Sequence, residues 1–192
     1  MDKKPKKLLY TILFVGELFL VFAAIIILTI KKQSFISIFN LHQTPNIFIL
    51  FLIITVAFTI AISISFSVIK LHLFKDIKIV IEEIINSFNL NVFDIFIISL
   101  LAGVCEEILF RGVLQPMLGI WITSFIFILL HGYFNPFNWH MSVFGILMFC
   151  LSMIIGLIYI KYGLVAAIIF HIVYDFIAFS SFKKFIGNIN AA

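Results

Sequence analysis

Long apolar runs, separated by short polar or turn-forming segments, make up most of the chain. They extend over residues 8–30, 46–69, 92–115, 118–134, 141–160 and 163–180. A helix needs roughly 20 apolar residues to cross a hydrocarbon core about 30 Å thick, and most of these runs are near that length. The pattern therefore predicts an all-α fold, a polytopic bundle of about six transmembrane helices.

The segment between the second and third runs is amphipathic instead. Charged and amide side chains alternate at helical spacing with an apolar set, which comprises Leu73, Phe74, Ile77, Val80, Ile81, Ile84, Ile85 and Phe88. This pattern predicts a helix lying on the cytoplasmic membrane surface. A plain connector and a role in admitting substrate are equally compatible with it.

Composition supports a lipid environment. Of the 192 residues, 64% are hydrophobic and 11% are charged, and a soluble domain of this size could not hide so much apolar surface from water. The two cysteines, Cys105 and Cys150, lie in apolar runs without metal-ligand spacing, so they indicate neither a disulfide framework nor a thiolate zinc site. The first run is too long for a signal-peptide core, and we expect it to be a retained span.

The formal net charge of +4 comes from basic residues whose positions indicate the membrane topology, and we expect no nucleic-acid partner. Nine basic residues fall on the side of the N-terminus, namely Lys3, Lys4, Lys6, Lys7, Lys70, Lys75, Lys78, Lys183 and Lys184. Four lie on or near the other side, namely Lys31, Lys32, Arg111 and Lys161. By the positive-inside rule, this bias predicts a multi-pass cell-membrane protein whose N-terminus and C-terminus are both cytoplasmic.

Ionisable residues are concentrated in the predicted spans. Each costs roughly 2.5 to 3.5 kcal/mol on insertion scales, so each needs a partner or a function. The third, fourth and sixth spans hold Glu106, Glu107, Arg111, His131, His171 and Asp175. Glu17 in the first span has no partner in this pattern, and we expect it to pack inward as a structural residue.

Helical geometry separates the two adjacent glutamates. Glu107 and Arg111 are four residues apart, so they share a helix face and can neutralise each other. Glu106 is turned by about 100° from Glu107 and is left without a local partner. A carboxylate in that position is a candidate general base.

Two further pairs share a helix face because their members are four residues apart: Phe127 with His131, and His171 with Asp175. If His131 and His171 face Glu106 from two other helices, the site combines a base, two imidazoles and an acidic orienting group. That arrangement favours hydrolysis.

The segment Glu106-Glu107-Ile108-Leu109-Phe110-Arg111-Gly112 resembles the EExxxR motif, commonly EExxFRG, of the CPBP intramembrane metalloprotease family. The family includes the CAAX proteases and the Abi proteins of bacteria, the latter linked to bacteriocin processing and immunity. Phe127 to His131 resembles the family's FxxxH motif, and His171 to Asp175 resembles HxxxN or HxxxD. The resemblance covers residues 92–180, in the family's order.

This resemblance implies a domain organisation and roles for the residues. Residues 92–180 would be the catalytic core, residues 1–91 the N-terminal spans and interfacial helix, and residues 181–192 a cytoplasmic tail. The implied catalytic residues are Glu106, His131, His171 and Asp175, the first two activating the attacking water. Glu107, Arg111 and Phe127 would be structural. Asp175 stands where the family usually has Asn, and a charged carboxylate is a poorer oxyanion donor.

The need for a metal stays open in the sequence. Glu106, His131 and His171 could hold Zn²⁺ or another divalent ion, yet they come from three helices and the chain lacks HExxH. Hydrolysis with and without a metal are therefore both compatible with the motifs.

Two classes of function follow. The first is an intramembrane endopeptidase that cuts a membrane-associated peptide or protein. The alternative is a non-proteolytic Abi-type membrane protein that acts in bacteriocin self-immunity or as a regulatory partner. An unpaired carboxylate in a membrane span favours the enzyme, because a residue that is so costly to insert is not expected in a protein that catalyses no reaction. A proton or ion pathway is less favoured, since the polar residues gather in one layer.

Overall fold

The computed structural model describes residues 4–39 and 45–190, and side chains as far as residue 185. The described chain is helical and contains no strand. In order, its elements are α1 Lys6–Ile30, η1 Phe35–Phe39, α2 Ile47–Lys70, η3 His72–Phe74, α3 Lys75–Ser87, α4 Val92–Glu107, η4 Ile108–Leu114, α5 Gln115–Leu130 and α6 Trp139–Asn190. Lys3 of the predicted cytoplasmic set and the last two residues of the predicted tail lie outside the described residues.

Within the described residues, four continuous helices are long and apolar enough to cross a membrane: Lys6–Ile30, Ile47–Lys70, Val92–Leu130 and Trp139–Phe185. The prediction of an all-α transmembrane bundle is thus confirmed. The last two helices, of 39 and 47 residues, exceed a single crossing. Each contains one glycine with non-helical backbone, Gly119 at φ 79° and ψ 165° and Gly163 at φ 79° and ψ 178°.

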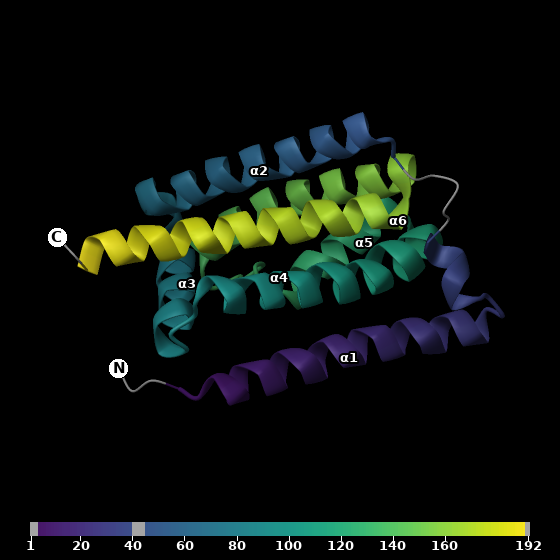
Figure 1. The fold of residues 1–192 in the computed structure, drawn as a ribbon, viewed down its shortest axis with the longest axis horizontal. Coiled ribbons are helices and arrows are strands. Elements are labelled where there is room, and N and C mark those ends of the chain that lie inside the picture. Colours follow the sequence, from purple (N-terminus) through teal and green to yellow (C-terminus); the bar gives the residue numbers. More distant parts are fainter. Residues whose placement is uncertain (1–3, 40–44, 191–192) are drawn as a thin grey trace.

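The direction of the chain reverses at Gly163. Before it, Arg111 bonds to Ser152 and Gln115 bonds to Gly156, so this part of α6 runs parallel to the third span. After it, Gly103 meets Ile172 and Gly112 meets Leu164, which is an antiparallel arrangement. The two halves of α6, green and yellow, lie side by side in Figure 1 and join at one end of the bundle. The chain also reverses at Gly119, because Phe110 contacts Phe127 and Glu106 lies near His131. In the described residues, the four continuous helices therefore make six helical passes, of which the fourth follows Gly119 and the fifth and sixth lie on either side of Gly163.

The fourth pass is shorter than the sequence predicts. The apolar run over 118–134 suggested a full span, but regular helix begins only after Gly119 and α5 ends at Leu130. Gly119 and Gly132 both have positive φ, so a left-handed turn lies at each end of this pass. Eleven helical residues extend about 17 Å, well short of the hydrocarbon thickness, so His131 lies within the depth of the bundle.

The amphipathic segment forms α3, which crosses one end of the bundle in Figure 1. Its buried apolar residues, Ile77, Ile81 and Ile85, recur every four positions and pack on the bundle. The Asn138 side-chain amide donates a 2.8 Å hydrogen bond to Asp76 and so ties the loop before α6 to α3.

The first helix is held to α4 at its N-terminal end. Asn91 and Asp94 form a capping box that begins α4. Asp94 also accepts a 2.5 Å hydrogen bond from the Tyr10 hydroxyl and forms an ion pair with Lys6. Both helices begin at the same end of the bundle in Figure 1, so α1 runs parallel to α4, and these contacts hold their N-terminal ends together.

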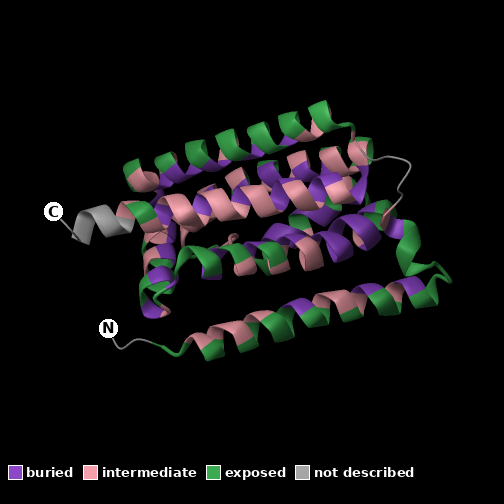
Figure 2. Ribbon diagram, viewed as in Figure 1, coloured by how far each residue is buried: buried purple, intermediate pink, exposed green. Residues whose placement is uncertain are grey.

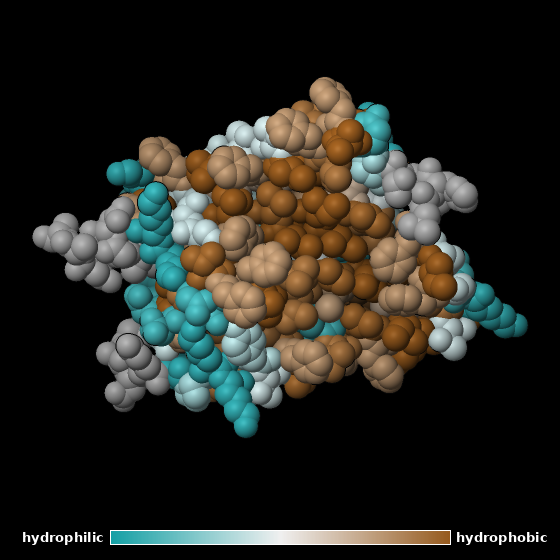
Figure 3. Space-filling view, in the orientation of Figure 1, coloured by the Kyte–Doolittle hydropathy of each residue, from teal (hydrophilic) through white to brown (hydrophobic). Residues whose placement is uncertain are grey.

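The outer surface of the bundle is apolar. Figure 3 shows a brown hydrophobic belt across the middle of this face, with hydrophilic side chains gathered at its ends. In Figure 2, the outward sides of α1 and α2 are exposed whereas their inward sides include buried residues. Phe19, Phe22, Phe48 and Phe51 are each more than 60% exposed, as lipid-facing residues are in the absence of lipid.

One residue of the predicted charge count is placed differently. Arg111, counted on or near the side opposite the termini, is completely buried within the third span. It therefore does not contribute to the charge of either membrane surface.

We predict that Gly119→Ala destabilises the protein by about 1 to 3 kcal/mol, because a side chain at this backbone conformation is strained. No atom lies within 4 Å of a Cβ placed at Gly119, so the loss would come from the backbone rather than from a clash. The matched control is Gly16→Ala, also with open space but within regular helix, where alanine is the better helix former. Thermal unfolding in detergent measures both, and equal melting temperatures would contradict the prediction.

Candidate active site

Four of the predicted site residues converge from three helices on one point. The closest atoms of Glu106 and His131, Oε1 and Nε2, are 3.6 Å apart. Glu106 Oε2 lies 3.8 Å from His171 Nε2, which in turn lies 3.5 Å from Asp175 Oδ2. The structure therefore brings together Glu106, His131, His171 and Asp175, which the sequence places on the third, fourth and sixth spans.

These residues line a cavity of about 420 Å³. Its walls are mostly apolar, and they extend from the four polar residues to the inner side of α3, where Ile77, Val80, Ile81 and Ile84 lie. The side chains of His131 and Asp175 are 29% and 20% exposed, whereas that of His171 is 7% exposed. The site is thus embedded in the bundle but reachable.

A backbone contact orients His131. Its Nδ1 lies 2.7 Å from the carbonyl oxygen of Phe127, and because a carbonyl can only accept, Nδ1 carries the hydrogen. The neutral ring then presents the lone pair of Nε2 toward Glu106. Phe127 and Tyr133 flank the ring, with centroids at 4.3 and 5.6 Å.

A carboxylate orients His171. Glu107 Oε1 accepts a 2.8 Å hydrogen bond from Nδ1 of His171, and both side chains are buried. This bond directs Nε2 of His171 toward Glu106 and Asp175. The two adjacent glutamates therefore face the same imidazole, Glu107 from behind and Glu106 from the cavity.

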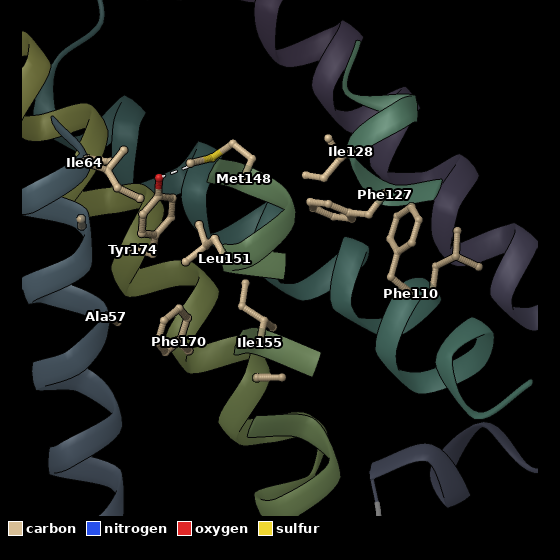
Figure 4. Packing of buried hydrophobic residues seen from close by; sticks show 14 of the residues in the cluster. Ala57, Ile64, Phe110, Phe127, Ile128, Met148, Leu151, Ile155, Phe170 and Tyr174 are labelled. Atoms are coloured by element: carbon tan, nitrogen blue, oxygen red, sulfur yellow. Dashed lines mark hydrogen bonds between the residues drawn. The ribbon is translucent and has the colours of Figure 1, made fainter. Parts of the chain in front are cut away.

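Behind the site lies a completely buried ion pair. Arg111 Nε is 3.2 Å from Glu107 Oε2, and both residues have no exposed surface. Arg111 also donates a 2.9 Å hydrogen bond to the Ser152 hydroxyl on α6, and its guanidinium lies 5.2 Å from the Phe127 ring centroid. Figure 4 shows Phe127 beside Phe110, whose ring centroid is 4.8 Å away. The pair thus links three helices.

The third span departs from α-helical geometry at this point. Residues Ile108–Leu114 form a π-helix, η4, where the Gln115 N–H donates to Phe110 five residues earlier. Pro116 directly follows Gln115 and has no backbone N–H. The Gly112 carbonyl therefore lacks the hydrogen-bond donor that the residue four positions later provides in an α-helix. Wider turns of this kind are frequent at functional sites. The sequence predicted a regular helix here.

Sequence reasoning missed three residues of this site. Glu17 of α1, expected to pack inward as a structural residue, lines the cavity with Glu106. Tyr133 stacks on His131, and Ser152 receives the Arg111 hydrogen bond. Of these three residues, only Glu17 could have been found from the sequence, because an ionisable side chain in a membrane span requires a partner or a function.

The three metal ligands that the sequence suggests, Glu106, His131 and His171, all line this cavity. In the described part of the chain, no group of three or more His, Cys, Asp or Glu side chains is placed to hold a metal ion. Glu106 faces each imidazole through a different oxygen, Oε1 toward His131 and Oε2 toward His171.

The arrangement of the four residues suits a bound water. The separations of 3.6 and 3.8 Å between Glu106 and the two imidazoles are too long for direct hydrogen bonds but fit groups that share a water molecule. Such a water would contact a carboxylate and an oriented imidazole lone pair at once.

A family model described as "Type II CAAX prenyl endopeptidase Rce1-like" matches residues 88–177. The matched range holds all four converging residues together with Glu107, Arg111 and Phe127. No curated protein and no solved structure matches the chain significantly.

We predict that Glu107→Ala lowers the free energy of unfolding by about 3 to 5 kcal/mol, because it leaves the Arg111 charge buried without a partner. Glu83→Ala serves as the control, since Glu83 is an exposed glutamate of α3. The double variant Glu107→Leu/Arg111→Met should recover much of the loss, because it removes both charges. Thermal unfolding and the yield of monodisperse protein measure the three variants, and a Glu107→Ala protein as stable as Glu83→Ala would refute a structural role.

Proposed function

The chain belongs to the CPBP/CAAX protease family, and from this premise we propose that it is an intramembrane endopeptidase in which Glu106 and His131 activate the attacking water. The family match confirms the resemblance that the three motifs predict. It also supports a peptide substrate and a multi-pass membrane setting. The observation that carries the mechanism is the position of Glu106, whose two oxygens face the Nε2 atoms of two separately oriented imidazoles.

The first step is attack by water on the peptide carbonyl. A water between Glu106 and His131 gives a proton to one of them, and its oxygen forms a bond to the carbonyl carbon. The protonated group then transfers the proton to the leaving amine, and the C–N bond breaks. Water and the peptide bond are consumed, and a carboxylic acid and an amine are released.

His171 stabilises the oxyanion of the tetrahedral intermediate in this proposal. With Nδ1–H bonded to Glu107, the protonated ring has Nε2–H free to donate to the developing charge. Asp175, at 3.5 Å from the same nitrogen, favours the protonated ring. In this role Asp175 acts through His171, which explains how a carboxylate can serve where the family usually has Asn.

The substrate reaches the site from the end of the bundle that carries α3, because the cavity extends from Glu106 to that helix. Lys6, Lys78 and the end of α6 lie at this same end, as the contacts of Lys6 with Asp94 and of Lys78 with Phe185 indicate. By the positive-inside rule we assign this end, with both termini, to the cytoplasm. The substrate is then a membrane-associated peptide or protein cut near the cytoplasmic face. The non-proteolytic Abi-type alternative receives no support from the family match.

We predict that Glu106→Gln and His131→Ala each lower peptide cleavage by about 100- to 10,000-fold, the loss expected for a removed acid or base. Both residues lie in a partly exposed cavity, so melting temperature and yield should stay close to those of the unmodified protein. Quantitative proteomics of membranes from cells with either form would identify a peptide that accumulates uncut. Full cleavage by Glu106→Gln would refute the enzyme proposal.

We predict that purified protein keeps its peptidase activity after incubation with EDTA or 1,10-phenanthroline, because the proposed water activation uses side chains alone. The control is the same treatment of a zinc peptidase of known dependence. Loss of activity that returns on addition of Zn²⁺ would show instead that Glu106, His131 and His171 bind a metal.

A further inference from the structure

Glu17 reaches the candidate active site from the first helix. It is 8% exposed and lines the same cavity as Glu106, His131, His171 and Asp175. The shared cavity places Glu17 at the depth of the site, because its lining contains Glu17 of α1 together with Glu106 of α4. This residue lies outside the region that the family model matches.

The charged groups around the cavity do not balance. Three carboxylates line it, on Glu17, Glu106 and Asp175, and no lysine or arginine is among its lining residues. Among the described residues that line it, only the imidazoles of His131 and His171 can become cationic. Arg111 lies behind the wall and is already paired with Glu107. Even with both imidazoles protonated, one negative charge would remain.

The remaining carboxylate is that of Glu17. Glu106 faces both imidazoles, and Asp175 faces His171. Within residues 4–39 and 45–185, no cationic side chain lies within 4 Å of Glu17, and its buried Oε2 atom has no hydrogen-bond partner. Burial of a carboxylate without a partner is unfavourable, so a bound cation or proton donor would stabilise it.

The shape of the cavity indicates which cation it can take. Its walls away from the polar cluster are apolar, including Ile81, Met148 and Phe182. Lysine and arginine side chains combine an aliphatic stem that packs on such walls with a charged head. A small hydrated ion would leave the apolar walls without contact.

We propose that Glu17 is the recognition site for a lysine or arginine side chain of the substrate, close to the bond that is cut. This assignment rests on the proposed endopeptidase function. Because Glu17 is level with Glu106, the basic residue would lie beside the scissile peptide rather than at the distant, α3-lined end of the cavity. The site would therefore select basic peptide segments without taking part in water activation.

Binding of two matched probes to the full-length protein in nanodiscs tests this assignment. The probes are N-dodecanoyl-lysine amide and N-dodecanoyl-norleucine amide, which share a stem and differ in the charged amine. Equilibrium dialysis against empty nanodiscs corrects for partition into lipid. We expect the lysine probe to bind at least tenfold more tightly, and Glu17→Gln to reduce this ratio to about two or less. The control Glu83→Gln makes the same chemical change on an exposed part of α3 and should keep the full ratio.

Two outcomes would overturn the assignment: a ratio near one in the unmodified protein, or an undiminished ratio in Glu17→Gln. The second would show that Glu17 is a neutral, protonated residue or that Glu106 binds the amine. If Glu17→Gln does not fold, Glu17→Met replaces it, since an apolar side chain of similar length suits the interior of the bundle. Cleavage that survives Glu106→Gln would refute the endopeptidase, whereas a failed probe ratio with Glu106-dependent cleavage would refute the Glu17 site alone.

Discussion

Glu107 and Arg111 form an ion pair with no exposed surface in the centre of the bundle, and the rest of the candidate site is built against it. Each partner also makes a hydrogen bond to another helix, Arg111 to Ser152 and Glu107 to Nδ1 of His171. A charge buried in this way is stable only while all of its contacts are kept, so the pair restricts how the third, fifth and sixth passes can pack. The same restriction orients the imidazole that faces Glu106.

Backbone irregularity then creates the space in front of that pair. The π-helix η4 widens the third pass just after Glu107, and left-handed turns at Gly119 and Gly132 shorten the fourth pass so that it ends inside the bundle at His131. A regular 20-residue helix would carry its C-terminal residues to the membrane surface, far from the depth of Glu106. The short pass instead leaves a cavity that extends to α3 and is bounded by apolar side chains. In such surroundings a carboxylate and an imidazole interact more strongly than they would in water.

The two halves of the chain contribute differently to the site. Residues 88–177 match the protease family and carry the converging acid and imidazole groups, whereas α1 precedes that region and adds Glu17. Lys6 and Tyr10 hold the N-terminal end of α1 to Asp94, and the packing of α1 along α4 and η4 decides whether Glu17 reaches the cavity. Under the proposed function, the matched region supplies the groups that activate water, and α1 supplies the group that binds the substrate.

The all-α membrane class and the amphipathic helix were predictable from the sequence, because hydropathy and i, i+4 spacing are local properties. The grouping of Glu106, His131, His171 and Asp175 came from the resemblance of three motifs to one family, since local spacing does not bring residues of three helices together. Spacing also paired Glu107 with Arg111 correctly, as both atoms of the contact lie on one helix. The bond from His171 to Glu107, the shortened fourth pass and the π-helix depend on contacts between distant segments or on backbone strain, which spacing does not report. The cavity position of Glu17 depends on the packing of α1 against α4 across 88 residues, so only the tertiary structure could decide it.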